Sequence, residues 1–112
     1  MKILISSTES GWNADMDGRF GRAMGFVLYD EESKELSWHS NEENLNAAHG
    51  AGPKAAEFAI NTGASVLISS HVGPKAFDVL KHSDIKIFLA SEKTIKEVYE
   101  AYKRGELKQQ DH

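Results

Sequence analysis

Two arginines, Arg19 and Arg22, lie three positions apart in a glycine-rich string early in the chain, where residues 17–23 read Asp-Gly-Arg-Phe-Gly-Arg-Ala. A guanidinium group presents a planar fork of N–H donors that suits compact anions. The glycines of the string permit sharp turns. The string therefore predicts an anion-binding loop. A structural alternative stays open, in which Asp17 pairs with one of the arginines and Phe20 packs onto the core.

Two histidines stand in matching positions beside glycines. His49 comes just before Gly50, and His71 comes shortly before Gly73. A neutral imidazole is a common metal ligand and a charged one pairs with anions, so these two histidines are the candidate metal ligands. Gly50, Gly52 and Gly73 would let a bulky ligand approach the backbone closely. In the alternative interpretation, each histidine is an exposed and inert loop residue.

Other site chemistries have little support in the sequence. The chain has no cysteine, which excludes disulfides, thiolate nucleophiles and cysteine-based zinc or iron–sulfur ligation. The acids Asp15, Asp17 and Asp30 have no spacing that would enforce the carboxylate cluster of a metal-dependent nuclease. No serine lies in a Gly-x-Ser-x-Gly elbow, and neither a Walker loop nor a Gly-x-Gly-x-x-Gly motif is present.

The composition is that of an ordinary globular domain. The 112 residues include 40% hydrophobic and 27% charged side chains, enough for a hydrophobic core. We expect one domain over residues 1–107 and a frayed polar tail over residues 108–112. The formal net charge of −4 argues against binding to nucleic acid or to an anionic membrane. No apolar run is long enough for a membrane span or a secretory signal, so the sequence predicts a cytoplasmic protein.

Strands and helices must position these candidate residues, and the hydrophobic pattern predicts them in alternating order. Apolar runs predict strands over residues 2–6, 65–69 and 85–90, and residues 26–30 and 35–39 indicate a hairpin. Helices are expected over residues 53–61, from Pro74, and after a cap at Ser91 or Thr94. Strands separated by helices favour parallel pairing, while the hairpin makes the sheet mixed. The pattern predicts an α/β sandwich.

A short motif occurs twice, because residues 52–55 and residues 73–76 both read Gly-Pro-Lys-Ala. Each copy begins an expected helix that leads into a strand. Small hydroxyl residues end the expected strands, namely Ser6, Ser7, Ser69, Ser70 and Ser91. The carboxyl ends of parallel strands share one edge of the sheet, where ligands of open α/β sheets bind. Helix N termini supply N–H groups and partial positive charge, so this edge should attract an anion.

The sequence resembles the dinitrogenase iron–molybdenum cofactor biosynthesis family, with its NifX-like, NifY-like and NifB C-terminal-like domains. Four segments carry the resemblance, and they occur in the same order along the chain: the first strand, the string at residues 17–23, the segment at residues 49–52 and the turn at residues 73–76. The resemblance spans about residues 1–107. It implies a ribonuclease-H-like three-layer α/β/α fold with a five-stranded mixed sheet, and non-enzymatic holding of an iron–molybdenum or iron–sulfur cluster. The family-like positions are Arg19, Phe20, Gly21, Arg22, His49, Gly50, Gly52, Gly73 and Pro74. Without cysteine, only imidazoles, carboxylates, arginines and backbone N–H groups are left to hold such a cluster.

Our hypothesis from the sequence is a non-enzymatic carrier of an anionic metallocluster, with no organic cofactor. Arg19 and Arg22 would supply charge, and His49 and His71 would be ligands or hydrogen-bond donors. A cofactor-assembly protein is the expected partner, and the chain itself is expected to be a monomer or a weak homodimer. Two alternatives remain: an enzyme acting on a phosphate-bearing metabolite at the same strand edge, and a protein-interaction module without a small ligand.

Overall fold

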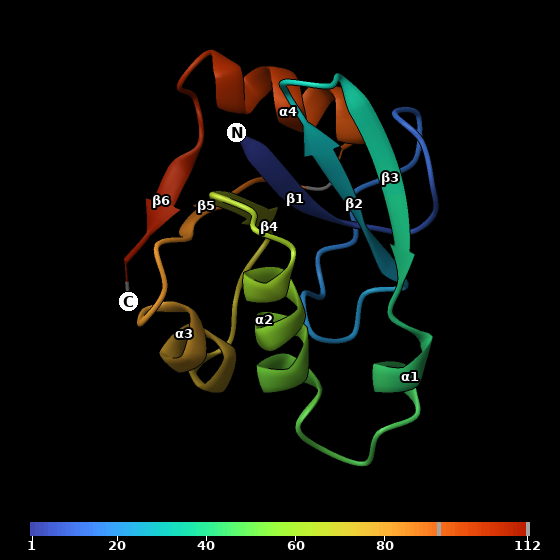
Figure 1. The fold of residues 1–112 in the computed structure, drawn as a ribbon, viewed down its shortest axis with the longest axis vertical. Coiled ribbons are helices and arrows are strands. Elements are labelled where there is room, and N and C mark those ends of the chain that lie inside the picture. The colour runs from blue at the N-terminus through green and yellow to red at the C-terminus, as the bar shows by residue number, and fades with distance from the viewer. Residues whose placement is uncertain (92, 112) are drawn as a thin grey trace.

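A computed structural model describes residues 1–91 and 93–111, so Glu92 and His112 lie outside the described residues. Its centre is a six-stranded sheet with the order β3-β2-β1-β4-β5-β6 (Figure 1). The strands are β1 (Lys2–Ser7), β2 (Gly25–Asp30), β3 (Glu35–Ser40), β4 (Val66–Ser69), β5 (Lys86–Leu89) and β6 (Lys108–Gln110). Strands β1, β4 and β5 run parallel, whereas β2 and β6 pair antiparallel with β1 and β5. The predicted mixed α/β sheet, with its β2–β3 hairpin, is confirmed.

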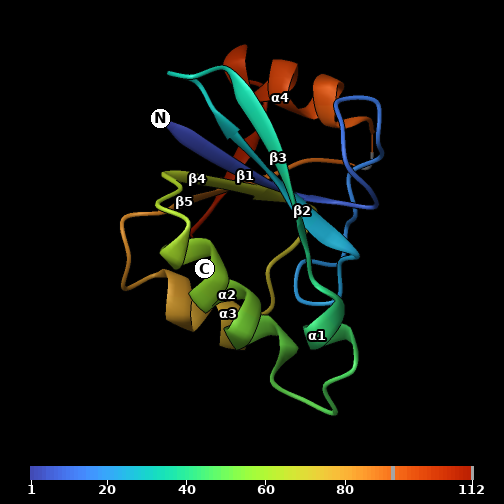
Figure 2. The same cartoon turned by 45° about the vertical axis from the view of Figure 1, so that its right-hand side comes forward.

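Helices cover both faces of the sheet. Helices α2 (Ala51–Asn61) and α3 (Pro74–Leu80) lie on one face, and α4 (Ile95–Lys103) lies on the other (Figure 2). The single turn of α1 (Glu42–Leu45) follows β3 and stands out from the layers. The result is the expected three-layer arrangement, while its classification as ribonuclease-H-like stays a prediction. Among the described helices, none is both long enough and apolar enough to cross a membrane.

Each side of the sheet has its own apolar core because successive strand residues point to opposite faces. In the central strand β1, Leu4 faces α2 and α3, whereas Ile3 and Ile5 face α4. The α2 face is lined by small side chains that let the helix lie close to the sheet, namely Ala55, Ala56 and Ala59. The first loop, residues 8–24, contacts both faces, because Phe20 and Ala23 pack in the core beside α2 whereas Ala14 and Met16 pack in the core beside α4.

The sixth strand corrects the expectation of five strands and a frayed tail. Residues 108–110 pair with β5, and the side chain of Gln110 is buried. The amide of Gln110 donates a hydrogen bond to the carbonyl of Val72 at 2.8 Å and accepts one from the N–H of Val72 at 3.1 Å. The Gln110 side chain thus supplies hydrogen-bond partners for both the N–H and the carbonyl of a buried backbone residue. Apolar runs in the sequence give no sign of such a contact. The contact holds the turn that precedes α3.

The helix starts follow the predicted capping residues, with two differences. Thr94 caps α4 in a reciprocal capping box with Glu97. Helix α3 begins at the predicted proline. Helix α2 begins earlier than expected, at Ala51, after Gly50 adopts a left-handed φ of 83°. The predicted loop over residues 40–49 contains the unexpected turn of α1, because Asn41 accepts the first backbone bonds from residues 44 and 45.

A carboxylate joins the hairpin to α4, and its loss is expected to weaken that contact. Glu31 accepts hydrogen bonds from the hydroxyl of Tyr99 and, at 2.9 Å, from Nζ of Lys103. The Tyr99 hydrogen bond holds the pKa of Glu31 below its usual value. We expect Glu31→Gln to lower the free energy of unfolding in urea by about 1 kcal/mol. Glu106→Gln is the control, because Glu106 forms an exposed ion pair with Arg104, and it should leave the free energy of unfolding unchanged. Equal losses in the two variants would contradict the role of Glu31 in holding the hairpin on α4.

Candidate functional site

The buried carboxylate of Asp17 organises the first loop, residues 8–24. Its Oδ1 accepts hydrogen bonds from the backbone N–H and from Nε of Arg19, both at 3.0 Å. Its Oδ2 accepts from Nη2 of Arg19 at 2.9 Å and from the N–H of Met24 at 3.2 Å. These four bonds join both ends of the string at residues 17–23. One acid therefore contributes four hydrogen bonds to the order of a segment without hydrophobic periodicity.

The charge of this carboxylate persists at neutral pH. Burial by itself would raise the pKa of Asp17, but hydrogen bonds from Arg19 and from the N–H of Met24, with the positive charge of Arg19, hold it below the usual value. The pairing of Asp17 with Arg19 matches the structural alternative that the sequence left open. The Arg19 side chain is nevertheless 66% exposed, so its charge remains at the surface.

Three strand-end serines hold the loop rather than face a ligand. Ser6, Ser7 and Ser69 are fully buried. The hydroxyl of Ser6 donates to the carbonyl of Asp17, and its oxygen lies 2.9 Å from the hydroxyl oxygen of Ser69. The hydroxyl of Ser7 donates to the carbonyl of Glu9. Of the five strand-end serines expected to share this edge of the sheet, Ser6 and Ser69 are in hydroxyl contact, and the bonds of Ser6 and Ser7 fasten the first loop to β1.

Two glycines bring the first loop directly onto the first turn of α2. A Cβ atom placed on Gly21 would lie 2.8 Å from both Cα and N of Gly52, closer than real side chains approach a backbone. Gly50 precedes this turn with its left-handed φ, a conformation that favours glycine. The close approach explains the glycine at position 21, and it brings the string at residues 17–23 and the segment at residues 49–52 together.

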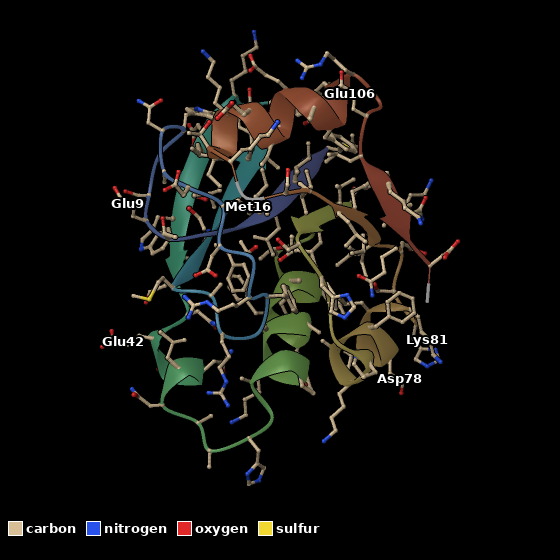
Figure 3. All side chains as sticks on the ribbon, turned by 180° about the vertical axis from the view of Figure 1, so that it is seen from behind. Glu9, Met16, Glu42, Asp78, Lys81 and Glu106 are labelled. Atoms are coloured by element: carbon tan, nitrogen blue, oxygen red, sulfur yellow. The ribbon has the colours of Figure 1, made fainter. Side chains whose placement is uncertain are left out.

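The first loop and the N-terminal turns of α2 and α3 surround one depression of about 440 Å³. Its charged lining consists of three cations, Arg19, Arg22 and Lys75, and the described lining residues include no carboxylate. Backbone at Gly21, Gly52 and Gly73 forms much of the remainder. Figure 3 shows the neighbouring acids Glu42, on α1, and Asp78, on α3, pointing outward. The sheet edge therefore presents a positively charged hollow, in a chain of net negative charge.

Arg22 also contacts the segment that follows β3. Its Nη1 donates to the backbone carbonyls of Asn44 at 3.2 Å, Leu45 at 3.4 Å and Ala47 at 3.0 Å. Asn44 and Leu45 belong to α1, whereas Ala47 follows it, and the carbonyl of Asn44 also accepts a hydrogen bond from the N–H of Ala47. The guanidinium group therefore links α1 to the depression.

The other predicted site residues have different surroundings. Phe20 is buried in the core, with its ring centroid 5.6 Å from that of Phe26, so it supports the loop from below. His49 and His71 are both exposed, and neither lines the depression. His71 lies beside the loop, because its backbone forms a β-bridge with Arg19. The described residues contain no group of three or more His, Cys, Asp or Glu placed to hold a metal ion, so a metal-ligating role of the two histidines stays a prediction.

The arrangement of loop, glycine turns and sheet has counterparts in known proteins. The model of the family described as "Dinitrogenase iron-molybdenum cofactor" matches residues 1–105. The chain belongs to this family. A relative, an uncharacterized protein of Methanocaldococcus jannaschii, is 30% identical over 97 residues, which cover 85% of this chain and 82% of the relative.

Two solved structures of the same kind share the fold closely. The apo form of the orange protein from Desulfovibrio gigas is 32% identical, with a TM-score of 0.93, over 98% of this chain and 92% of that one. A candidate NifB protein from Thermotoga is 31% identical, with a TM-score of 0.83, over 96% of this chain and 91% of that one. The family resemblance that the sequence indicated is confirmed over nearly the whole chain.

Lys75 is the lining residue that sequence reasoning missed. It lies in the second Gly-Pro-Lys-Ala motif, on the first turn of α3, and the motif itself was the available signal. The matching lysine of the first copy, Lys54, lines a different groove, between α1 and α2. Of the two lysines in the duplicated motif, only Lys75 therefore lines the depression. Helix α3 has only seven residues, so the positive charge here comes mainly from side chains.

Proposed function

We propose that this chain is a non-enzymatic carrier of an anionic metallocluster, either iron–molybdenum cofactor or an iron–sulfur precursor, bound in the depression between the first loop, α2 and α3. One observation carries the proposal: three cations and no carboxylate line the depression among the described residues, and of the three cations Arg19 is paired with the carboxylate of Asp17. The whole chain has a net charge of −4, so this concentration of positive charge is local. Membership in the iron–molybdenum cofactor family supports the kind of cargo.

The residues present favour a cargo that brings its own inorganic ligands. The chain has no cysteine, and its described residues contain no metal-binding group of side chains. Such a cargo would be held as a whole anion, by guanidinium and ammonium groups and by backbone N–H groups at the start of α2. Release to a cofactor-assembly protein would then require no ligand exchange with protein side chains.

The same lining favours a carrier over an enzyme that acts on a phosphate-bearing metabolite. Hydrolysis of a phosphoester usually needs a group that can donate or accept a proton near the reacting atoms. Among the described residues, the depression is lined by neither a carboxylate nor an imidazole. The N–H donors of arginine and lysine bind and position anions, which is the task of a carrier.

Lys75→Gln tests the proposal with little risk to the fold. Lys75 is exposed and forms no ion pair with any described residue, so its change should leave the thermal midpoint unaltered. In an anaerobic titration with isolated iron–molybdenum cofactor, followed by visible absorbance, we expect its affinity to fall about fivefold, the factor that about 1 kcal/mol produces.

Lys96→Gln provides the matched control, because Lys96 is an exposed lysine on α4, across the sheet from the depression. It removes the same charge and should leave the affinity unchanged. Absence of any absorbance change with the wild-type protein would contradict the proposed function. Equal losses in both lysine variants would show that binding depends on net charge alone and would contradict the proposed site.

A further inference from the structure

Residues 42–49, which contain α1 and the turn before Gly50, form a strap beside the depression. None of the α1 residues is buried. In Figure 1, α1 and the chain after it extend away from the three layers before returning to α2. A groove of about 520 Å³ separates α1 from the aromatic side chains of Phe26 and Phe58. The strap therefore has little apolar contact with the body and has space in which to move.

Arg22 supplies the hydrogen bonds that hold this strap. The strap begins at the buried Asn41, whose amide donates to the carbonyls of Gly21 at 3.1 Å and Ala23 at 3.0 Å. At the start of the strap, the N–H of Glu42 also donates to Oγ of Ser40 at 3.2 Å. Apart from the bonds to Ser40 and Asn41, the hydrogen bonds between residues 42–49 and other parts of the described chain come from Nη1 of Arg22. The position of the strap beyond its first residues therefore depends largely on one guanidinium group.

The same guanidinium group has donors to spare for a ligand. Arg22 lines the depression, and its Nε and Nη2 make no hydrogen bond with a described residue. An Nε–Nη2 edge is the fork that binds oxyanions and similar groups through two parallel hydrogen bonds. Arg22 can therefore hold an anion with this edge while Nη1 still holds the carbonyls of the strap. Lysine has one ammonium group and no such fork.

We infer that an anion in the depression locks the strap, because both bind opposite edges of the Arg22 guanidinium group. This inference rests on the proposed function only in so far as the depression binds anions. Fixing Arg22 from one side strengthens its bonds on the other. By thermodynamic linkage, the ordered strap must raise anion affinity by the same factor as the anion stabilises the strap. The strap would thereby retain cargo, and a partner that displaced residues 42–49 would promote its release.

Hydrogen exchange of residues 42–49, read by mass spectrometry, tests the latch first without any ligand. Arg22→Gln is expected to speed exchange of the strap about tenfold, the factor that corresponds to about 1.4 kcal/mol of lost hydrogen bonding. Arg22→Lys should have a similar effect, because the lysine side chain is one bond shorter than that of arginine and its ammonium group would fall short of the position of Nη1. Lys96→Gln, on the opposite face, should leave exchange unchanged. Unchanged exchange in Arg22→Gln would overturn the inference.

Inorganic phosphate then serves as the probe of coupling. Saturating phosphate is expected to slow strap exchange in the wild-type protein and to have no such effect in Arg22→Lys. Asn44→Gly, which weakens α1 without touching the depression, should reduce phosphate affinity, by at most the factor by which phosphate slows exchange. If phosphate leaves the exchange rate of the strap unchanged in the wild-type protein, the proposed coupling between anion binding and strap order is overturned.

Isolated iron–molybdenum cofactor separates this inference from the proposed function. If phosphate slows strap exchange but the cofactor does not bind, the inference about the strap stands and the proposed carrier function is contradicted. If the cofactor binds without any change in strap exchange, the proposed carrier function stands and the inference about the strap is overturned.

Discussion

Replacing Gly21 with alanine is expected to disrupt both the fold of the first loop and the site it forms. The added Cβ would lie 2.8 Å from backbone atoms of Gly52, and neither backbone can turn aside as a flexible side chain would. The loop must move off α2, which we expect to cost about 2–3 kcal/mol in the free energy of unfolding. The shift also separates Arg22 from Lys75, so affinity for an anion should fall together with stability.

Gly73→Ala is the matched control, because it adds the same methyl group at the opposite side of the depression. A Cβ atom on Gly73 would have no neighbour within 4 Å, and its φ of −65° suits any residue. We expect urea unfolding to change by less than about 1 kcal/mol. A Gly21→Ala protein as stable as Gly73→Ala would contradict the close packing of the loop on α2.

Asp17→Asn is expected to have the second large effect. The substitution keeps the side-chain shape but removes the charge that accepts two bonds from the guanidinium group of Arg19 and two from backbone N–H groups. An asparagine NH₂ group would meet donors where an oxygen accepted before. Because Arg19 is largely exposed, we expect a loss of about 2–3 kcal/mol, below that of a fully buried ion pair.

The same variant should alter the response of stability to acid. The pKa of Asp17 is lowered in the folded protein, so the unfolded chain takes up its proton first as the pH falls. The stabilisation from Asp17 is therefore present above about pH 4 and is lost as the pH drops through the folded-state pKa. Urea unfolding at neutral pH and near pH 3 should show a larger acid-induced loss in wild type than in Asp17→Asn. The exposed neighbour Asp15, changed to Asn, should behave as wild type; identical acid losses in all three proteins would refute the role of Asp17.

The fold was largely predictable because apolar runs and helix starts carry strong local signals. The central strands, the hairpin and the proline start of α3 all follow from hydrophobic runs or from the special chemistry of proline. Strand β6 has no such signal, since Gln110 becomes buried only by bonding to Val72, which is distant in sequence. Helix α1 has no such signal either, because it buries no residue and the carbonyls of Asn44 and Leu45 bond to Arg22, which is distant in sequence.

The site was predictable in outline and not in its individual contacts. The glycines and the repeated Gly-Pro-Lys-Ala motif indicated which segments would meet at the end of the parallel strands. The sequence could not show that Arg19 would share its charge with Asp17, nor that Lys75 would face the depression while Lys54 would not. These outcomes depend on side-chain directions, which are set by tertiary packing rather than by residue spacing.

The location of the cargo tests the central claim most directly. Crystals of protein loaded anaerobically with isolated iron–molybdenum cofactor can be measured at the iron and molybdenum absorption edges. We expect anomalous density for both metals in the depression among Arg19, Arg22 and Lys75. Density elsewhere on the protein, such as beside Trp12 on the opposite face, would contradict the assignment of the site, and so would cofactor-binding protein whose depression contains no metal.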